Sequence, residues 1–212
     1  MEAYLFSFVV PYLTAAICVG ELLRLAGVEI SKRPGKLIVL FVPVILVLLP
    51  VKQVPMARFL AGFSADFSIT LAALLFGFLL WLIEGIRLFD RRALRTVSIS
   101  GLVLGLCLYI CSMNLAPFDL YRFGWGSIYL IAPLFIVTIW LILAGNRAGF
   151  ILAAAVAAYG LRLLESDNLW DYLVDPFLVG WCLIASIPES SSRFRPLFRR
   201  GFGNKVQRIR GI

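Results

Sequence analysis

The chain has 212 residues, of which 61% are apolar and only 15% are charged, and its mean hydropathy is +0.95. Soluble domains are nearer half apolar and about a quarter charged, so this composition excludes an ordinary soluble enzyme, a disordered protein and a disulfide scaffold. The net charge is +8, and the basic residues flank apolar runs, as Lys and Arg do in membrane proteins. The composition therefore predicts a polytopic membrane protein, with no nucleic-acid partner.

Seven apolar runs predict membrane-crossing helices, which need about 20 mostly apolar residues each. The N-terminus has neither a basic region nor a small-residue cleavage site, so we expect the first run to be a retained helix. The sixth and seventh runs are short, with about 16 clean residues each. The predicted spans are Ala3–Gly27, Leu37–Val54, Phe67–Phe89, Val97–Ala116, Gly126–Gly145, Gly149–Leu164 and Tyr172–Ile187.

The distribution of charge predicts the orientation of these spans. If the C-terminal tail is cytoplasmic, seven spans place the N-terminus outside. Sixteen of the 20 basic residues then lie on the cytoplasmic side, and seven of the 12 acidic residues lie outside. This split follows the positive-inside rule. Two domains result: a transmembrane bundle over residues 1–187 and a basic cytoplasmic tail over residues 188–212.

The segment between the second and third spans repeats apolar residues at helical spacing: Met56, Phe59, Leu60 and Phe63. The spacing predicts a short helix lying in the outer interface. Asp66 would then cap the start of the third span.

Small residues mark two of the predicted spans. Gly101 and Gly105 form a Gly-xxx-Gly pair in the fourth span, and the sixth is rich in alanine. Such faces let helices approach closely, either within the chain or against a partner subunit or a second copy. The tight Asn146-Arg147 turn predicts that the fifth and sixth spans form an antiparallel hairpin.

Two Glu-Arg pairs lie at i,i+3 spacing near the inner ends of the first and third spans. They are Glu21 with Arg24 and Glu84 with Arg87. Each pair predicts an intrahelical ion pair, and an alternative is one polar site shared by the two spans.

The predicted outer loops bring carboxylates, arginines and aromatic residues to one membrane surface. Asp171 and Asp175 share a face if their stretch is helical, although Pro176 disfavours a helical Asp175. Trp125, Trp170, Tyr121 and Tyr172 also suit an ordinary aromatic belt. The arginines suit an anionic headgroup or lipid-linked phosphate, and paired carboxylates suit acid-base chemistry. The candidate substrate-binding residues are Asp119, Arg122, Arg162, Asp171 and Asp175.

The sequence contains no histidine, which excludes His-ligated haem, His-based zinc hydrolysis and a Ser-His-Asp triad. All four cysteines, Cys18, Cys107, Cys111 and Cys182, fall in apolar runs and are expected to be buried. A soft-metal site at Cys107 and Cys111 is the alternative. We predict no metal and no cofactor.

The tail interleaves seven basic residues with phenylalanines and leucine, which predicts contact with anionic lipid or with a cytoplasmic partner. The fold is expected to be an all-α bundle in a bacterial inner membrane. Because the chain carries no evident catalytic motif, we predict a small transport component or an accessory subunit of a cell-envelope assembly. The alternative is an enzyme acting at the periplasmic face on a lipid-linked or phospholipid substrate.

Overall fold

The computed structural model describes residues 6–51, 53–61, 67–113, 115, 117–126 and 128–186. These residues are mostly helical, and the one sheet among them is a two-stranded hairpin, so the all-α prediction is confirmed. The elements in chain order are α2 (Val9–Leu25), α3 (Arg33–Leu48), β1 (Pro50–Val51), β2 (Val54–Pro55), α4 (Met56–Ala61), α5 (Ile69–Glu84), α6 (Arg91–Ser112), the 3-10 helix η1 (Tyr121–Gly124), α7 (Ile128–Leu143), α8 (Ala148–Gly160), α9 (Leu169–Leu173) and α10 (Pro176–Ser186).

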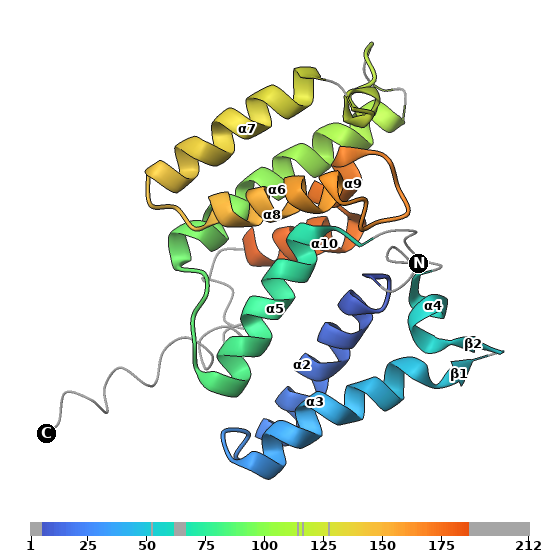
Figure 1. Cartoon of the computed structure of the whole chain (residues 1–212), viewed down its shortest axis with the longest axis vertical. Coiled ribbons are helices and arrows are strands. Elements are labelled where there is room, and N and C mark those ends of the chain that lie inside the picture. Colours follow the sequence, from blue (N-terminus) through green and yellow to red (C-terminus); the bar gives the residue numbers. More distant parts are fainter. Residues whose placement is uncertain are drawn as a thin grey trace, which may run out of the picture.

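Each of the seven predicted segments overlaps one of the helices α2, α3, α5, α6, α7, α8 and α10, although α3 and α6 begin four and six residues before their predicted spans. These helices run back and forth between two ends of the bundle (Figure 1). By length and composition, α6 is the one helix in the described ranges that could cross a membrane. The helices α5, α7, α8 and α10 are apolar but shorter.

Several helices stop earlier than predicted, for identifiable reasons. The second predicted span ends at Leu48 because Pro50 follows closely, and the chain then turns through β1 and β2. The predicted interfacial helix is present as α4, and the rest of that segment lies outside the described residues. Asp66, which was predicted to cap the next helix, also lies outside the described residues. The cap is Ser68, whose hydroxyl accepts a hydrogen bond from the Leu71 amide.

The Gly-xxx-Gly pair of α6 packs against α10 within the chain. A methyl group on Gly101 would lie 2.9 Å from the Cys182 sulfur, and one on Gly105 would collide with Val179. The absence of a side chain at both positions therefore allows the two helices to approach closely.

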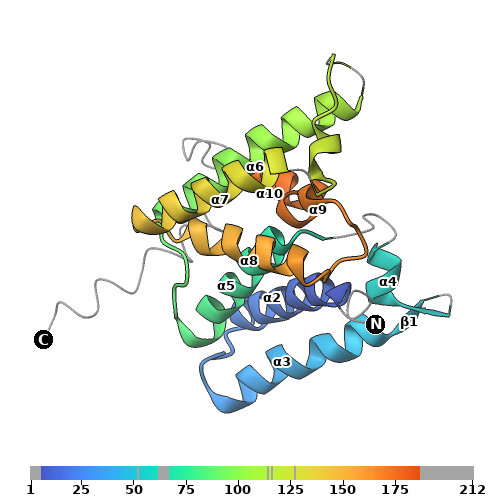
Figure 2. The ribbon, with the colours of Figure 1, turned by 45° about the horizontal axis from the view of Figure 1, so that its top comes forward.

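The predicted hairpin of α7 and α8 is also present, and the two helices lie side by side in both views (Figures 1 and 2). Gly145 has a positive φ of 67° and closes the C-terminus of α7. Asn146, which is buried, accepts a hydrogen bond from the Ala148 amide and so starts α8.

The two ends of the bundle differ in charge. We call one the basic end, formed by loops 26–32, 85–90 and 144–147 with the adjoining helix turns. Of the 12 basic residues in the described ranges, nine lie there, beside four acidic ones. We call the other the acidic end, formed by β1, β2, α4, residues 117–126 and residues 161–175. It carries three arginines and five acidic residues.

Candidate functional site

The acidic end is organised around one buried asparagine. Asn168 is fully buried, and its side-chain oxygen accepts a hydrogen bond from the Trp170 amide, which starts α9. Its amide nitrogen donates to the Tyr121 carbonyl at 3.0 Å. Gly124 lies against the same side chain so closely that a methyl group there would overlap it. Asn168 therefore joins the 117–126 segment to α9.

Two aromatic side chains strengthen this junction. The indole nitrogen of Trp170 donates to the Leu120 carbonyl at 3.0 Å. The buried Tyr172 hydroxyl accepts from the Leu164 amide at 3.1 Å and lies 3.2 Å from the Ser166 carbonyl, to which it donates. Both rings were expected to suit a membrane belt, but their polar atoms fix loop conformations.

Asp171 is a partly exposed carboxylate held by two hydroxyl groups. The Tyr121 hydroxyl lies 2.8 and 3.0 Å from its two oxygens, and the Ser166 hydroxyl also donates to it. In the part of the chain that the structure describes, Asp171 forms no salt bridge. Its charge is therefore held in place without being neutralised.

Asp175 has a different environment, because it is buried between two helix starts. One oxygen accepts from the Leu178 amide of α10 at 2.9 Å, and the other accepts from the Ser68 amide at the start of α5 at 2.8 Å. Backbone amides at helix N-termini stabilise a carboxylate through hydrogen bonds and the helix dipole. This geometry gives Asp175 a structural role as a cap shared by two helices.

The two aspartates do not share a helix face. The helix α9 ends at Leu173, and Val174 is extended, with φ −141° and ψ 133°. The bias imposed by Pro176 therefore outweighs the helical spacing.

The other three candidate site residues are Asp119, Arg122 and Arg162. Asp119 accepts a hydrogen bond from the Tyr121 amide at 2.9 Å and so forms the turn that leads into η1. Arg122 is exposed on η1, and Arg162 is exposed at the end of α8. Arg162 has a positive φ of 53°, the left-handed conformation of a helix C-terminus that glycine usually occupies.

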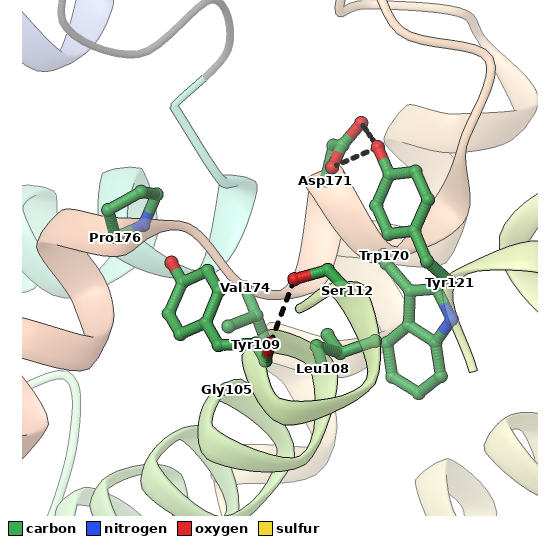
Figure 3. A pocket seen from close by; sticks show the side chains of 9 residues that line it. All are labelled: Gly105, Leu108, Tyr109, Ser112, Tyr121, Trp170, Asp171, Val174 and Pro176. Carbon is green, nitrogen blue, oxygen red and sulfur yellow. Dashed lines mark hydrogen bonds between the residues drawn. The ribbon is translucent and has the colours of Figure 1, made fainter. Parts of the chain in front are cut away.

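A cavity of about 300 Å³ opens between the C-terminal half of α6 and the segment from α9 to Pro176. Asp171 and Tyr121 lie on one side of it, and Tyr109 and Pro176 lie across from them (Figure 3). Its volume is at the lower limit of the range usual for small-ligand pockets. Its described lining is Gly105, Leu108, Tyr109, Ser112, Tyr121, Trp170, Asp171, Val174 and Pro176.

The sequence did not point to Tyr109 or Ser112, because both lie within an apolar run and carry no motif. Their position relative to Asp171 depends on the close packing of α6 on α10. The Gly-xxx-Gly pair was the signal for that packing, but it does not specify which side chains then meet at the end of the helix.

At the basic end, Glu21 and Arg24 form the expected i,i+3 ion pair at 3.2 Å. Glu84 and Arg87 were expected to pair within one helix, but Arg87 lies beyond the end of that helix. The helix α5 ends at Glu84, and Gly85 turns the chain with a φ of 73°. Both Glu84 oxygens lie 2.7 Å from Lys36 of α3.

In the loop between α2 and α3, Glu29 and Lys32 pair at 2.7 Å. The hydrogen bond and the positive charge of Lys32 lower the pKa of Glu29, and Glu29 correspondingly raises the pKa of Lys32.

The cysteines are not all buried as predicted. Cys111 and Cys182 are buried, whereas Cys18 and Cys107 are exposed on α2 and α6. Small apolar residues are tolerated on either face of these helices, so the apolar run did not determine burial. Within the described ranges, no group of three or more Cys, Asp or Glu side chains is arranged to hold a metal ion.

Comparison of the chain with protein-family models, with curated proteins and with solved structures finds no match.

Proposed function

We propose that this chain is a multi-pass membrane protein in which α2, α3, α5, α6, α7, α8 and α10 cross the bilayer. The acidic end and the N-terminus face outwards, and the basic end and the 188–212 tail face the cytoplasm. The supporting observation is the concentration of nine of 12 described basic residues at one end. Seven further basic residues stand in the tail, which lies outside the described residues.

The surface between the two ends is the second support for a membrane location, and it is the observation that carries this proposal. Only Thr138 and Leu141 of α7 are buried, and Ile136 and Trp140 are 66% and 64% exposed. Large side chains are exposed in the same way along α3, including Phe41 and Ile45, both at 63%. Water would penalise such a surface, whereas hydrocarbon stabilises it.

The shortness of several of these helices is compatible with crossing a bilayer. Flanking Trp, Tyr, Lys and Arg residues and local bilayer thinning accommodate short apolar stretches at a modest cost. At the acidic end, residues 161–168 follow α8, and α9 precedes α10. The chain therefore continues past the ends of both helices there.

Within a bacterial inner membrane, we propose a non-catalytic role, as a small transport component or an accessory subunit of a cell-envelope assembly. The outer carboxylates support this choice. Asp175 and Asp119 accept hydrogen bonds from backbone amides, which makes them parts of the scaffold. The basic tail would lie on anionic lipid of the cytoplasmic leaflet.

The alternative is an enzyme acting at the periplasmic face on a lipid-linked or phospholipid substrate. The observation that favours it is the cavity beside Asp171, whose carboxylate is partly exposed. Arg122 and Arg162 would then bind an anionic part of the substrate.

Affinity purification of the tagged full chain in mild detergent, with quantitative mass spectrometry of proteins and lipids, tests the choice. We expect a membrane protein of the envelope to co-purify in stoichiometric amount, and to be absent from purifications of an unrelated tagged membrane protein. A lone protein that carries a defined lipid-linked sugar, and converts it in a manner lost in Asp171→Asn, would contradict the non-catalytic proposal.

A further inference from the structure

We propose that the cavity beside Asp171 binds a cationic amine, as a protonated or quaternary ammonium group carried on an apolar stem. The proposal concerns the ligand class of the candidate site, and it depends on the proposed membrane location only for the source of the ligand.

The charges around the cavity are the first argument. Asp171 lines it, and none of the described lining residues is basic. Asp175 lies between the lining residues Val174 and Pro176 in the chain, but its oxygens accept hydrogen bonds from the starts of α5 and α10. The Asp171 carboxylate has no salt-bridge partner in the described ranges, so in this lining its charge produces a negative potential that favours a cation.

The hydrogen bonding of Asp171 leaves it able to bind more. An ionised carboxylate has about four acceptor positions, and Tyr121 and Ser166 supply hydroxyl donors to it. These two donors fix the orientation of the carboxylate beside the cavity. A ligand ammonium would then add a charge-assisted interaction without moving the side chain.

Aromatic side chains are the second argument. Tyr109, Tyr121 and Trp170 all contribute to the lining, and they come from α6, η1 and α9 (Figure 3). Aromatic faces attract ammonium groups, and several aromatics around one carboxylate are the usual composition of a site for methylated amines. The hydrogen bonds of Trp170 and Tyr121 hold two of these three rings in place.

The remaining lining determines what the ammonium is attached to. Gly105, Leu108, Val174 and Pro176 form an apolar part of the cavity, with no further charged group. A volume of about 300 Å³ is equivalent to roughly ten water molecules, enough for an ammonium head with a short apolar stem. Two sources offer this chemistry: the amine headgroup of a lipid and a free hydrophobic amine.

Binding of hexyltrimethylammonium to the purified full chain in an uncharged detergent tests the site itself. Calorimetry should show saturable binding, and 1-hexanol and hexanoate, which have the same stem, should bind at least about tenfold more weakly. Asp171→Asn should weaken hexyltrimethylammonium about tenfold or more. Asp167→Asn, an equal charge change at an exposed position of the same loop, should leave binding unchanged.

A second variant keeps the test decisive if Asp171→Asn does not fold. Tyr109→Leu removes one aromatic face, and it should reduce ammonium binding several-fold with little effect on 1-hexanol. Equal binding of hexyltrimethylammonium and 1-hexanol by the unmodified chain, or unchanged ammonium binding in both variants, would overturn the proposal. The membrane location would be unaffected by that result, because cysteine labelling tests it separately.

The source of the ligand is tested in nanodiscs that contain equal amounts of phosphatidylethanolamine and phosphatidylglycerol. Native mass spectrometry that finds the ethanolamine lipid retained by the unmodified chain, and lost in Asp171→Asn, supports a lipid headgroup. Hexyltrimethylammonium binding without such retention supports a free amine. Preferential retention of phosphatidylglycerol that Asp171→Asn does not alter would count against a cation site.

Discussion

The acidic and basic ends of this bundle stabilise helix termini differently, although Asp90 and the buried Asn146 also accept hydrogen bonds at the starts of α6 and α8 at the basic end. At the acidic end, buried side chains of Ser68, Asn168 and Asp175 accept hydrogen bonds from amides at helix starts. At the basic end, glycines at positions 27, 85 and 145 end helices with positive φ. Arginines there donate to carbonyl groups that follow helix ends.

The two ends therefore differ in how accessible their polar groups are to water and lipid. Ser68, Asn168 and Asp175 at the acidic end are buried and hold helix starts close to the cavity, which suits a site that must keep its shape. The polar groups of the basic end are largely exposed, and their charge is available to water and lipid headgroups. Substitutions at the acidic end and in its supporting helices should therefore lower the free energy of unfolding more than substitutions at the basic end.

The largest effect is expected where α6 meets α10, directly below the cavity. Gly105→Leu places a large side chain against Val179, so we expect loss of the folded protein, measured as detergent-soluble monodisperse material. The smaller change Gly105→Ala should cost about 1–3 kcal/mol of unfolding free energy through overpacking.

Gly180 of α10 provides the matched control, because a methyl group there meets nothing within 4 Å. Gly180→Ala should therefore leave accumulation and stability unchanged or slightly improved. Equal tolerance of Gly105→Leu and Gly180→Ala would show that the two helices are not packed through this pair.

Removal of the shared cap should have the next largest effect. Asp175→Ala leaves the Ser68 and Leu178 amides without their acceptor in a buried location, at a cost of about 2–4 kcal/mol. Thermal unfolding in detergent measures this cost. Asp175→Asn retains one acceptor oxygen and should lose less stability. Asp167→Asn should lose no stability. Full stability in Asp175→Ala, combined with loss of an activity, would instead support the enzyme alternative.

A smaller effect is expected at the basic end. The Arg147 guanidinium donates to the Arg87 and Leu88 carbonyls at 3.1 and 2.8 Å, and so ties the α7–α8 turn to the loop after α5. Because Arg147 is exposed, Arg147→Ala should cost only about 1 kcal/mol. Arg147→Lys keeps the charge and tests whether the hydrogen bonds or the charge matter. If Arg147→Ala lost as much stability as Asp175→Ala, the contrast between the two ends would be contradicted.

The smallest effect should be a gain in stability. Arg162 occupies a left-handed position at the C-terminus of α8, with the Leu163 amide bound to the Ala158 carbonyl at 3.1 Å. Glycine relieves this conformation, so Arg162→Gly should stabilise the protein by about 0.5–1 kcal/mol in the same unfolding assay. Destabilisation would show that the Arg162 side chain contributes contacts that outweigh its backbone strain.

The positions of the long helices could be predicted because apolar runs and their charged flanks are local signals. The ends of the helices were harder to predict. Pro50 and Gly85 each stop a helix inside an apolar run that was expected to continue as one. The apolar runs also predict that the helices cross a membrane. The position of a helix within a membrane depends on the surrounding bilayer as well as on the chain.

The site was less predictable than the fold. Asp171 and Asp175 look alike in the sequence, but one faces a cavity and the other caps two helices. That difference arises from Ser68, Tyr121 and Tyr109, which are 50 to 107 residues away from one or the other aspartate. Sequence spacing within one loop carries no information on such long-range partners.

Cysteine labelling in intact cells tests the central claim, that the acidic and basic ends lie on opposite sides of a membrane. In a variant whose four native cysteines are replaced by alanine, Ser31→Cys marks the basic end and Asp167→Cys marks the acidic end, both at exposed positions. With the outer membrane opened, a membrane-impermeant maleimide should label Cys at 167 at once, and Cys at 31 only after the inner membrane is permeabilised. Labelling of both positions before permeabilisation, or the reverse pattern, would contradict the account.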